Sequence, residues 1–202
     1  MLQVRIHGRG GQGVVTAAEM LSIAAFEEGR HAQAFPSFGS ERTGAPVVAF
    51  CRIDDQPIQI REPILAPDVL IIQDATLLHQ VDVFQGLKLD GYVLINSRHP
   101  FDELGLEDIA ERFCRERFIT LSATEIALRH LGRPLPNAVL LGGFAALTGL
   151  VGLDGVAHAI EHKFGGEIAR RNIAAATEAY EAVADATRSG ASVAGASQEA
   201  TE

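Results

Sequence analysis

The run His7-Gly8-Arg9-Gly10-Gly11-Gln12-Gly13 lies directly behind the first apolar segment of the chain and opens its first helical pattern. Leu2–His7 is predicted to be a strand, residues 11–28 carry apolar side chains at helical spacing, and His31–Phe35 is predicted to be a second strand. Glycines between a strand and a helix bring bare backbone N–H groups together at the helix N-terminus, which suits an anion, most often a phosphate of a nucleotide-type cofactor.

The acidic residue that accompanies such a loop in NAD-binding proteins is missing from this sequence. An NAD-binding fold places an acidic residue at the end of the second strand, where it holds the ribose hydroxyls. Gln33, Ala34 and Phe35 occupy that place, and Glu27 and Glu28 come too early, inside the predicted helix. The alternative is that the glycines form a tight turn and only let helix and strand pack closely.

The remaining chain predicts an α/β fold, with a three-layer, mixed Rossmann-like sheet, flanking helices and a C-terminal helical segment. Pro46–Asp54 alternates strictly, so that Val47, Ala49, Cys51 and Ile53 share one face. The further predicted strands are Pro57–Arg61 (pairing back as a hairpin), Val69–Gln73, Tyr92–Asn96 and Phe118–Leu121. The further predicted helices are Thr124–Leu131, Asn137–Leu150, Leu153–Phe164 and Glu167–Thr187.

Composition narrows the class of protein. The 202 residues are 47% hydrophobic and 21% charged, which is enough for one domain at residues 1–188, and the Ser/Ala/Gly-rich residues 189–202 are expected to be a disordered tail. A net charge of −9 argues against nucleic acid as a partner. No apolar run is long enough to span a bilayer, and no signal peptide is seen, so no membrane partner and a cytoplasmic location are expected.

Residues 37–45 form a polar segment without helical or strand periodicity. It carries Ser40, Glu41 and Arg42, and it is expected to lie at the same edge of the sheet as the glycine loop. Arg42 could grip a phosphate or carboxylate with its forked guanidinium. The alternative is a solvated loop with an internal charge pair between Glu41 and Arg42.

Three other features of the sequence are candidate sites. His158 and His162 fall in an H-x-x-E-H string with metal-ligand spacing, but no third ligand follows, and a polar helix face is the preferred interpretation. Cys51 is expected to be a small buried hydrophobe. His7 is expected to be a strand-end histidine hydrogen-bonded to backbone. No catalytic residue and no metal ligand is therefore assigned to this chain.

Two paired motifs resemble a known family. Residues 8–13 (GRGGQG) and residues 34–47 (AFPSFGSERTGAPV) are similar to the gamma subunit of the 2-oxoacid:ferredoxin oxidoreductases, with the pyruvate and 2-ketoisovalerate branches closest. Asn137-x-x-Leu-Leu-Gly-Gly143 and Asn172-x-x-Ala-x-x-x-x-Tyr180 resemble its C-terminal helices. The resemblance covers about residues 1–185.

The resemblance implies one part of a multisubunit enzyme that oxidatively decarboxylates a 2-oxoacid, such as pyruvate, to its acyl-CoA. In that family, thiamine diphosphate with Mg²⁺ is bound by alpha and beta subunits, and iron–sulfur clusters lie in beta and a ferredoxin-like delta subunit. Two distant cysteines, Cys51 and Cys114, agree with this division, because they cannot hold a cluster on four thiolates.

The gamma subunit of this family is associated with binding coenzyme A and closing over the active site. Coenzyme A offers a pyrophosphate for the glycine loop, and its 3′-phosphate would be repelled by a ribose-binding acid. The predicted contacts are Gly8, Arg9, Gly10, Gly11, Gln12, Gly13, Ser40, Glu41 and Arg42. The alternatives are a stand-alone Rossmann-type nucleotide-binding enzyme and a purely structural subunit.

Overall fold

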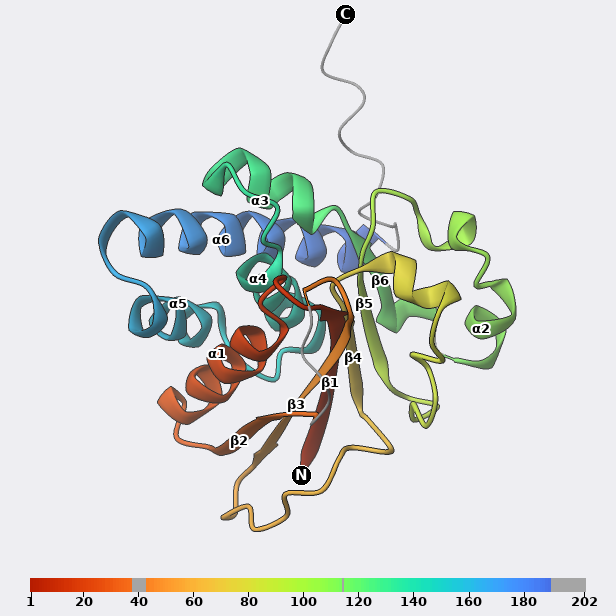
Figure 1. Cartoon of the computed structure of the whole chain (residues 1–202), viewed down its shortest axis with the longest axis horizontal. Coiled ribbons are helices and arrows are strands. Elements are labelled where there is room, and N and C mark those ends of the chain that lie inside the picture. Colours follow the sequence, from red (N-terminus) through yellow and green to blue (C-terminus); the bar gives the residue numbers. More distant parts are fainter. Residues whose placement is uncertain (38–42, 114, 190–202) are drawn as a thin grey trace, which may run out of the picture.

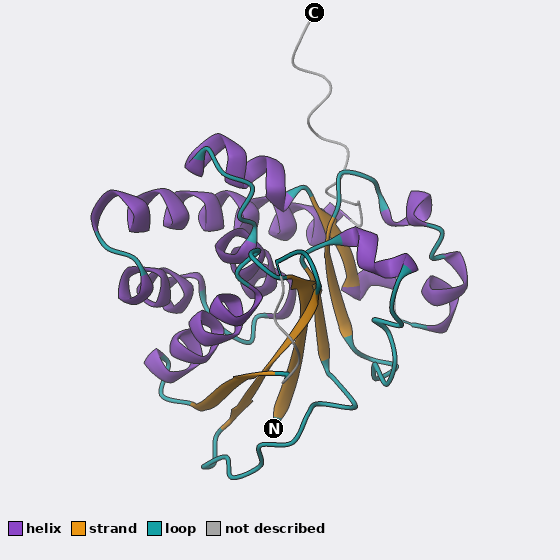
Figure 2. Ribbon diagram, in the orientation of Figure 1, coloured by secondary structure: helices purple, strands orange, loops and turns teal. Residues whose placement is uncertain are grey.

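The computed structural model of the protein describes residues 1–37, 43–113 and 115–189. Within them a six-stranded mixed sheet is covered by helices, as Figures 1 and 2 show. The strands are β1 (Leu2–Arg9), β2 (His31–Pro36), β3 (Pro46–Asp54), β4 (Val69–Ile72), β5 (Tyr92–Asn96) and β6 (Phe118–Leu121). The α/β fold class predicted from the sequence is confirmed.

The strand order is β2-β3-β1-β4-β5-β6, and β3 runs antiparallel to both of its neighbours. β1, β4, β5 and β6 are mutually parallel, so their carboxyl ends meet at one edge. After β1, the chain forms β2 and β3 on one side of β1 within the sheet, and then β4, β5 and β6 on its other side. The space between the carboxyl ends of β1 and β4 is therefore a topological switch point. Ligands of open α/β sheets bind beyond the carboxyl ends of the strands at such points.

The long helices gather on one face of the sheet (Figure 1). They are α1 (Val14–Glu27), α3 (Ala123–Leu131), α4 (Asn137–Thr148), α5 (Leu153–Lys163) and α6 (Gly166–Ser189). The predicted alternation of β3 is confirmed, because Ala49, Cys51 and Ile53 are buried in the core under these helices. α6 includes Ser189, and residues 190–202, assigned to the tail, lie outside the described residues.

The opposite face is covered over β4, β5 and β6 by short elements that the sequence periodicity did not indicate. They are the 3₁₀ helices η1 (Ala75–His79), η2 (Phe101–Leu104) and η3 (Arg115–Arg117) and the short helix α2 (Glu107–Arg112). They enclose a second apolar cluster that includes Leu77, Phe101 and Phe118. Elements this short carry too few residues to show a helical period.

The predicted strand at Pro57–Arg61 is wrong. In its place the chain runs irregularly, and the buried guanidinium of Arg52 donates to the carbonyls of Ile60 at 3.2 Å and Glu62 at 2.7 Å. A side chain from β3 thus satisfies the backbone acceptors that a hairpin partner would have satisfied.

The other boundary differences are small. β1 extends to Arg9 and β4 ends at Ile72, while α1 starts at Val14 instead of Gly11. No helix among the described residues has the length and apolarity needed to cross a membrane.

Candidate functional site

The glycine loop joins β1 to α1 at the switch point, and two of its glycines are required by close packing. Gly8 is the last residue of β1 that faces the helices, and a Cβ there would lie 2.6 Å from Val14 Cγ2. Gly13 caps α1 with a φ of 72°, and its Cβ would lie 2.5 Å from Asn137 Nδ2 at the start of α4. The loop therefore lies pressed between β1 and the N-termini of α1 and α4.

The segment that follows residues 38–42 returns to this loop, as predicted. Thr43 forms a bridge with Gly10, the Gly10 N–H donates to the Ala45 carbonyl at 2.9 Å, and the Gly44 N–H donates to the Gly10 carbonyl at 3.1 Å. Gly10 therefore does not offer the bare N–H group that was expected of the loop glycines. The predicted contacts Ser40, Glu41 and Arg42 lie outside the described residues.

Bare N–H groups are instead found at the start of α1. The first hydrogen bond of the helix runs from Ala17 N–H to the Gly13 carbonyl. The N–H groups of Gly13, Val14, Val15 and Thr16 have no acceptor among the residues that the structure describes. Together with the positive end of the helix dipole, they make a site suited to an anion.

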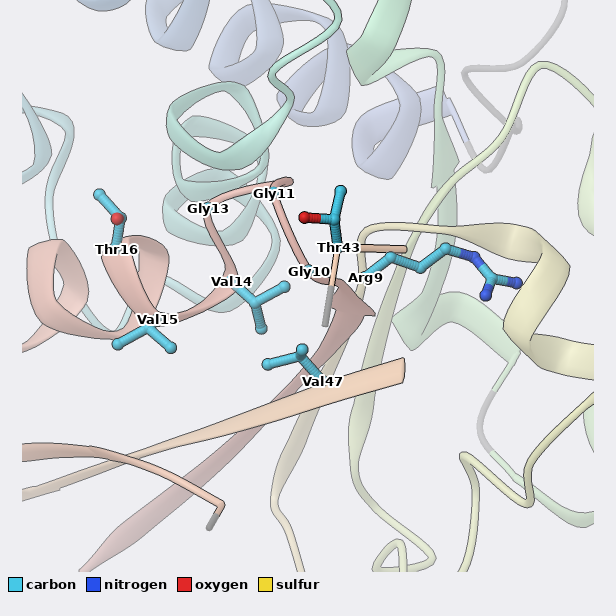
Figure 3. Close-up of a pocket in the computed structure, with 9 residues that line it drawn as sticks. All are labelled: Arg9, Gly10, Gly11, Gly13, Val14, Val15, Thr16, Thr43 and Val47. Atoms are coloured by element: carbon cyan, nitrogen blue, oxygen red, sulfur yellow. The ribbon is translucent and has the colours of Figure 1, made fainter. Parts of the chain in front are cut away.

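A pocket of about 450 Å³ lies over these groups, and Figure 3 shows the side chains around it. It is lined by Gly10, Gly11, Gly13, Val14, Val15, Thr16, Thr43, Val47 and Arg9. Within that lining, Arg9 is the charged side chain. The valines give the pocket an apolar wall beside its polar helix end.

Arg9 extends away from the helix end (Figure 3), and its guanidinium is held by protein acceptors. Its Nε donates to Asp74 Oδ2 at 3.0 Å and its Nη1 to the Gly44 carbonyl at 3.1 Å. Its Nη2 donates to Thr76 Oγ1 at 2.6 Å and to Gln80 Oε1 at 2.9 Å. In this arrangement Arg9 braces the loop, while its role as a phosphate ligand stays a prediction.

Gln12 also braces the loop from within. Its Oε1 accepts from the Arg9 backbone N–H at 2.8 Å, and its Nε2 donates to Asp74 Oδ2 at 2.8 Å. The side chain thus ties the loop to the carboxyl end of the neighbouring strand β4. Its predicted contact with a cofactor is not tested by this geometry.

Asp74 is the central acceptor of this network, and the sequence analysis did not single it out. Burial raises the pKa of its carboxyl, but hydrogen bonds from Thr76 and Gln12, with the charge of Arg9, outweigh burial and lower the pKa overall. Asp74 therefore stays ionised at neutral pH. Its position directly after a buried parallel strand was the available signal, because such ends meet at the ligand edge of the sheet.

Two other side chains considered in the sequence are buried. Cys51 is fully buried, and burial raises the pKa of its thiol to about 12, so the prediction of an inert hydrophobe is confirmed. Burial, with the nearby charge of Arg5, lowers the pKa of His7 to about 3. His7 Nε2 has no hydrogen-bond partner within the described residues, so the expected bond to backbone is not made by this nitrogen.

The histidines of the H-x-x-E-H string line different pockets. His158 lines one pocket with Glu28 and Tyr180, whereas His162 lines another with Glu19 and Gln33. Within the described ranges no three His, Cys, Asp or Glu side chains are grouped to hold a metal ion.

Comparison with known proteins gives consistent matches. The family model for pyruvate ferredoxin/flavodoxin oxidoreductase matches residues 3–182. The pyruvate synthase subunit PorC of Methanothermobacter marburgensis is 49% identical over 181 residues, covering 90% of this chain and 97% of that protein. The pyruvate/ketoisovalerate oxidoreductases common subunit gamma of Pyrococcus furiosus is 48% identical over 181 residues, covering 90% of this chain and 96% of its own.

Solved structures match as well. The crystal structure of pyruvate oxidoreductase subunit PORC from Thermotoga maritima has a TM-score of 0.75 at 36% identity, covering 89% of this chain and 95% of that chain. The 2-oxoglutarate:ferredoxin oxidoreductase from Magnetococcus marinus, with 2-oxoglutarate, coenzyme A and succinyl-CoA bound, shares the fold, with a TM-score of 0.73 at 18% identity. This chain covers 31% of that one. The resemblance to gamma subunits is confirmed, and the chain belongs to the pyruvate ferredoxin/flavodoxin oxidoreductase family.

Proposed function

We propose that this chain, a gamma-type subunit of a 2-oxoacid oxidoreductase, binds the phosphates of coenzyme A at the N-terminus of α1. The observation that carries the proposal is the row of unpaired N–H groups of residues 13–16 facing a pocket of about 450 Å³. An apolar wall beside an anion site suits a ligand that has both phosphates and a neutral body.

Two further observations favour coenzyme A over NAD. The last residues of β2 are Ala34, Phe35 and Pro36, so the strand ends without the carboxylate that would hold a ribose diol. The structure from Magnetococcus marinus, which shares this fold, was determined with coenzyme A bound. When bound, coenzyme A supplies the thiol that accepts the acyl group of the decarboxylated 2-oxoacid.

The remaining chemistry is assigned to partner subunits. We propose alpha and beta subunits that bind thiamine diphosphate and Mg²⁺, and iron–sulfur clusters in beta and in a ferredoxin-like delta subunit. Pyruvate is the leading 2-oxoacid, because similar proteins are named for pyruvate. We retain a cytoplasmic location as part of this proposal.

The anion site can be tested at Thr16, the third residue of α1, which lines the pocket. A carboxylate in the first turn suits the helix dipole but competes with a bound phosphate. For the Thr16→Glu variant of the assembled complex we expect the KM for coenzyme A to rise about tenfold or more, because a new like charge at the site disfavours the phosphates. The KM for the 2-oxoacid is the internal reference.

Thr16→Gln is the matched control, because it has the same length without the charge. The proposal requires the KM for coenzyme A to rise more in Thr16→Glu than in Thr16→Gln. Equal values in the two variants and in the wild type would favour the purely structural role instead.

A further inference from the structure

A second pocket lies across the glycine loop from the anion site. It has a volume of about 560 Å³ and shares Gly10, Gly11 and Thr43 with the first pocket. Its other walls come from the carboxyl ends of β4 and β5 and from the segment that precedes α4. The two pockets are thus neighbours that share these three residues as part of their walls.

Gln73 lines this second pocket, and its buried side-chain amide lacks hydrogen-bond partners, which points to a ligand. The side chain is 1% exposed, yet neither its Nε2 nor its Oε1 has a hydrogen-bond partner among the described residues. Buried amides in folded proteins are almost always paired, because an unpaired one keeps the full cost of leaving water. A buried donor and a buried acceptor are thus left unpaired in one residue of the pocket wall, and a ligand group must reach them at the pocket floor to pair with them.

The charge of the pocket argues against a second phosphate. Asp74 is the charged side chain among its lining residues, and it is kept ionised by its neighbours. Asn96 offers no free group, since its Nδ2 donates to the Gln73 carbonyl and Thr124 Oγ1 while its Oδ1 accepts from the Thr124 N–H. The pocket suits a neutral ligand that carries both a hydrogen-bond donor and an acceptor.

The lining combines uncharged polar side chains (Gln12, Thr43, Thr76 and Thr124) with an apolar part. Ala75 and the run Pro134-Leu135-Pro136 provide hydrocarbon surface beside the Gln73 amide. A secondary amide flanked by alkyl groups matches both the apolar surface and the unpaired donor–acceptor pair.

We infer that this second pocket binds the neutral, amide-bearing pantetheine arm of coenzyme A, with the amide of Gln73 paired to an amide of the arm, while the phosphates occupy the N-terminus of α1. The inference rests on the proposed function, because it takes coenzyme A as the ligand. In this inference Gln73 binds the neutral arm, whereas the glycine loop and the dipole of α1 bind the phosphates.

The test compares ligands with and without the arm by calorimetry on the assembled complex. The probes are coenzyme A, 3′-phospho-ADP, which keeps the phosphates but lacks the arm, and pantetheine, which is the arm alone. For Gln73→Met, of similar length but without the amide, we expect the Kd for coenzyme A and for pantetheine to rise about three- to tenfold. The Kd for 3′-phospho-ADP should stay at the wild-type value.

The unliganded Gln73→Met complex should be at least as stable as the wild type, because the variant removes an unpaired buried amide. Unchanged coenzyme A and pantetheine affinities in Gln73→Met, or equal losses for coenzyme A and 3′-phospho-ADP, would overturn the inference. Failure of the proposed function has a different signature, in which Thr16→Glu leaves both phosphate-bearing probes unaffected. Pantetheine binding still reports on Gln73 in that case.

Discussion

At the scale of single residues, the shape of the glycine loop depends on side chains as much as on glycines. Asp74 accepts hydrogen bonds from Arg9, Gln12 and Thr76 and so fixes the loop to the end of β4. The glycines supply the space and the backbone conformation, while this polar network holds the N-terminus of α1 in place beside the pocket. A loop held in this way before ligand arrives loses little entropy on binding.

A glycine can be required by its positive φ or by lack of space for a Cβ, and Gly13 and Gly11 distinguish these two reasons. Both have positive φ, 72° and 93°, but a Cβ at Gly13 would meet Asn137 whereas one at Gly11 would meet nothing within 4 Å. In urea denaturation of the chain, we expect Gly11→Ala to lower the free energy of unfolding by about 1–2 kcal/mol from backbone strain alone. Gly13→Ala should lower it further, through the added clash.

The double variant Gly13→Ala/Asn137→Ala identifies the source of the difference. Relative to Asn137→Ala alone, the added alanine at position 13 should cost about as much as Gly11→Ala does. An undiminished penalty in that background would mean that Asn137 is not the obstacle.

His7 makes the stability of the chain depend on pH. Its pKa is lowered from 6.5 to about 3 in the fold, first by burial and then by Arg5. Below about pH 6.5 the unfolded chain binds a proton that the folded chain refuses, so stability is fully present above that pH and falls toward pH 3. Between pH 6 and pH 4 we expect the wild type to lose about 2 kcal/mol more than His7→Phe.

Urea titrations at both pH values measure this difference. Asp74 and Glu178, whose pKa values are also lowered, titrate in both proteins and cancel in the comparison. Parallel pH profiles for the wild type and His7→Phe would contradict the assignment.

At the scale of elements, α4 and α6 pack closely because a glycine lies where their backbones approach each other. α4 and α6 cross at Gly142, where an added Cβ would lie 2.0 Å from the backbone carbonyl oxygen of Ala176. At Gly143, one residue on, the nearest atom would be Leu121 Cδ2 at 3.0 Å. The first contact is with rigid backbone, the second with a side-chain end that can shift.

We therefore expect Gly142→Ala to lower the free energy of unfolding by about 1–3 kcal/mol, because the two helices must separate. Gly143→Ala should remain within about 1 kcal/mol of the wild type, since better helix propensity offsets mild crowding. Thermal and urea denaturation of the two variants measure this. A Gly143→Ala penalty equal to or larger than that of Gly142→Ala would show that the crossing is not limited by Ala176.

At the scale of the whole molecule, we propose that the chain contributes a binding surface for coenzyme A while partner subunits carry out the chemistry. Its full sequence has two cysteines, too few for a cluster held by four thiolates. The face opposite the long helices is closed by short elements over β4–β6 and by the segment that Arg52 anchors. We therefore propose that the subunit binds its ligand at the edge of the sheet where the carboxyl ends of the parallel strands meet.

The isolated chain should accordingly fold but show no oxidation of pyruvate with a ferredoxin acceptor. Activity should appear when alpha, beta and delta partner subunits are added, and a complex lacking this chain should have a raised KM for coenzyme A. Turnover of pyruvate by the purified chain alone would rule out the proposed division of labour.

Long apolar periods in the sequence were sufficient to predict the secondary structure of α1, β3 and α4–α6. The sequence also placed the glycine loop between β1 and α1 and indicated the family through two motifs at residues 8–13 and 34–47. Which polar groups of the proposed site stay unpaired depends on the packing of the folded chain. That packing paired the Gly10 N–H with Ala45, turned Arg9 toward Asp74 and left the Gln73 amide unpaired. The first two outcomes are hydrogen bonds between residues more than 30 apart in sequence, and the third is the lack of any such partner, so no local pattern can specify them.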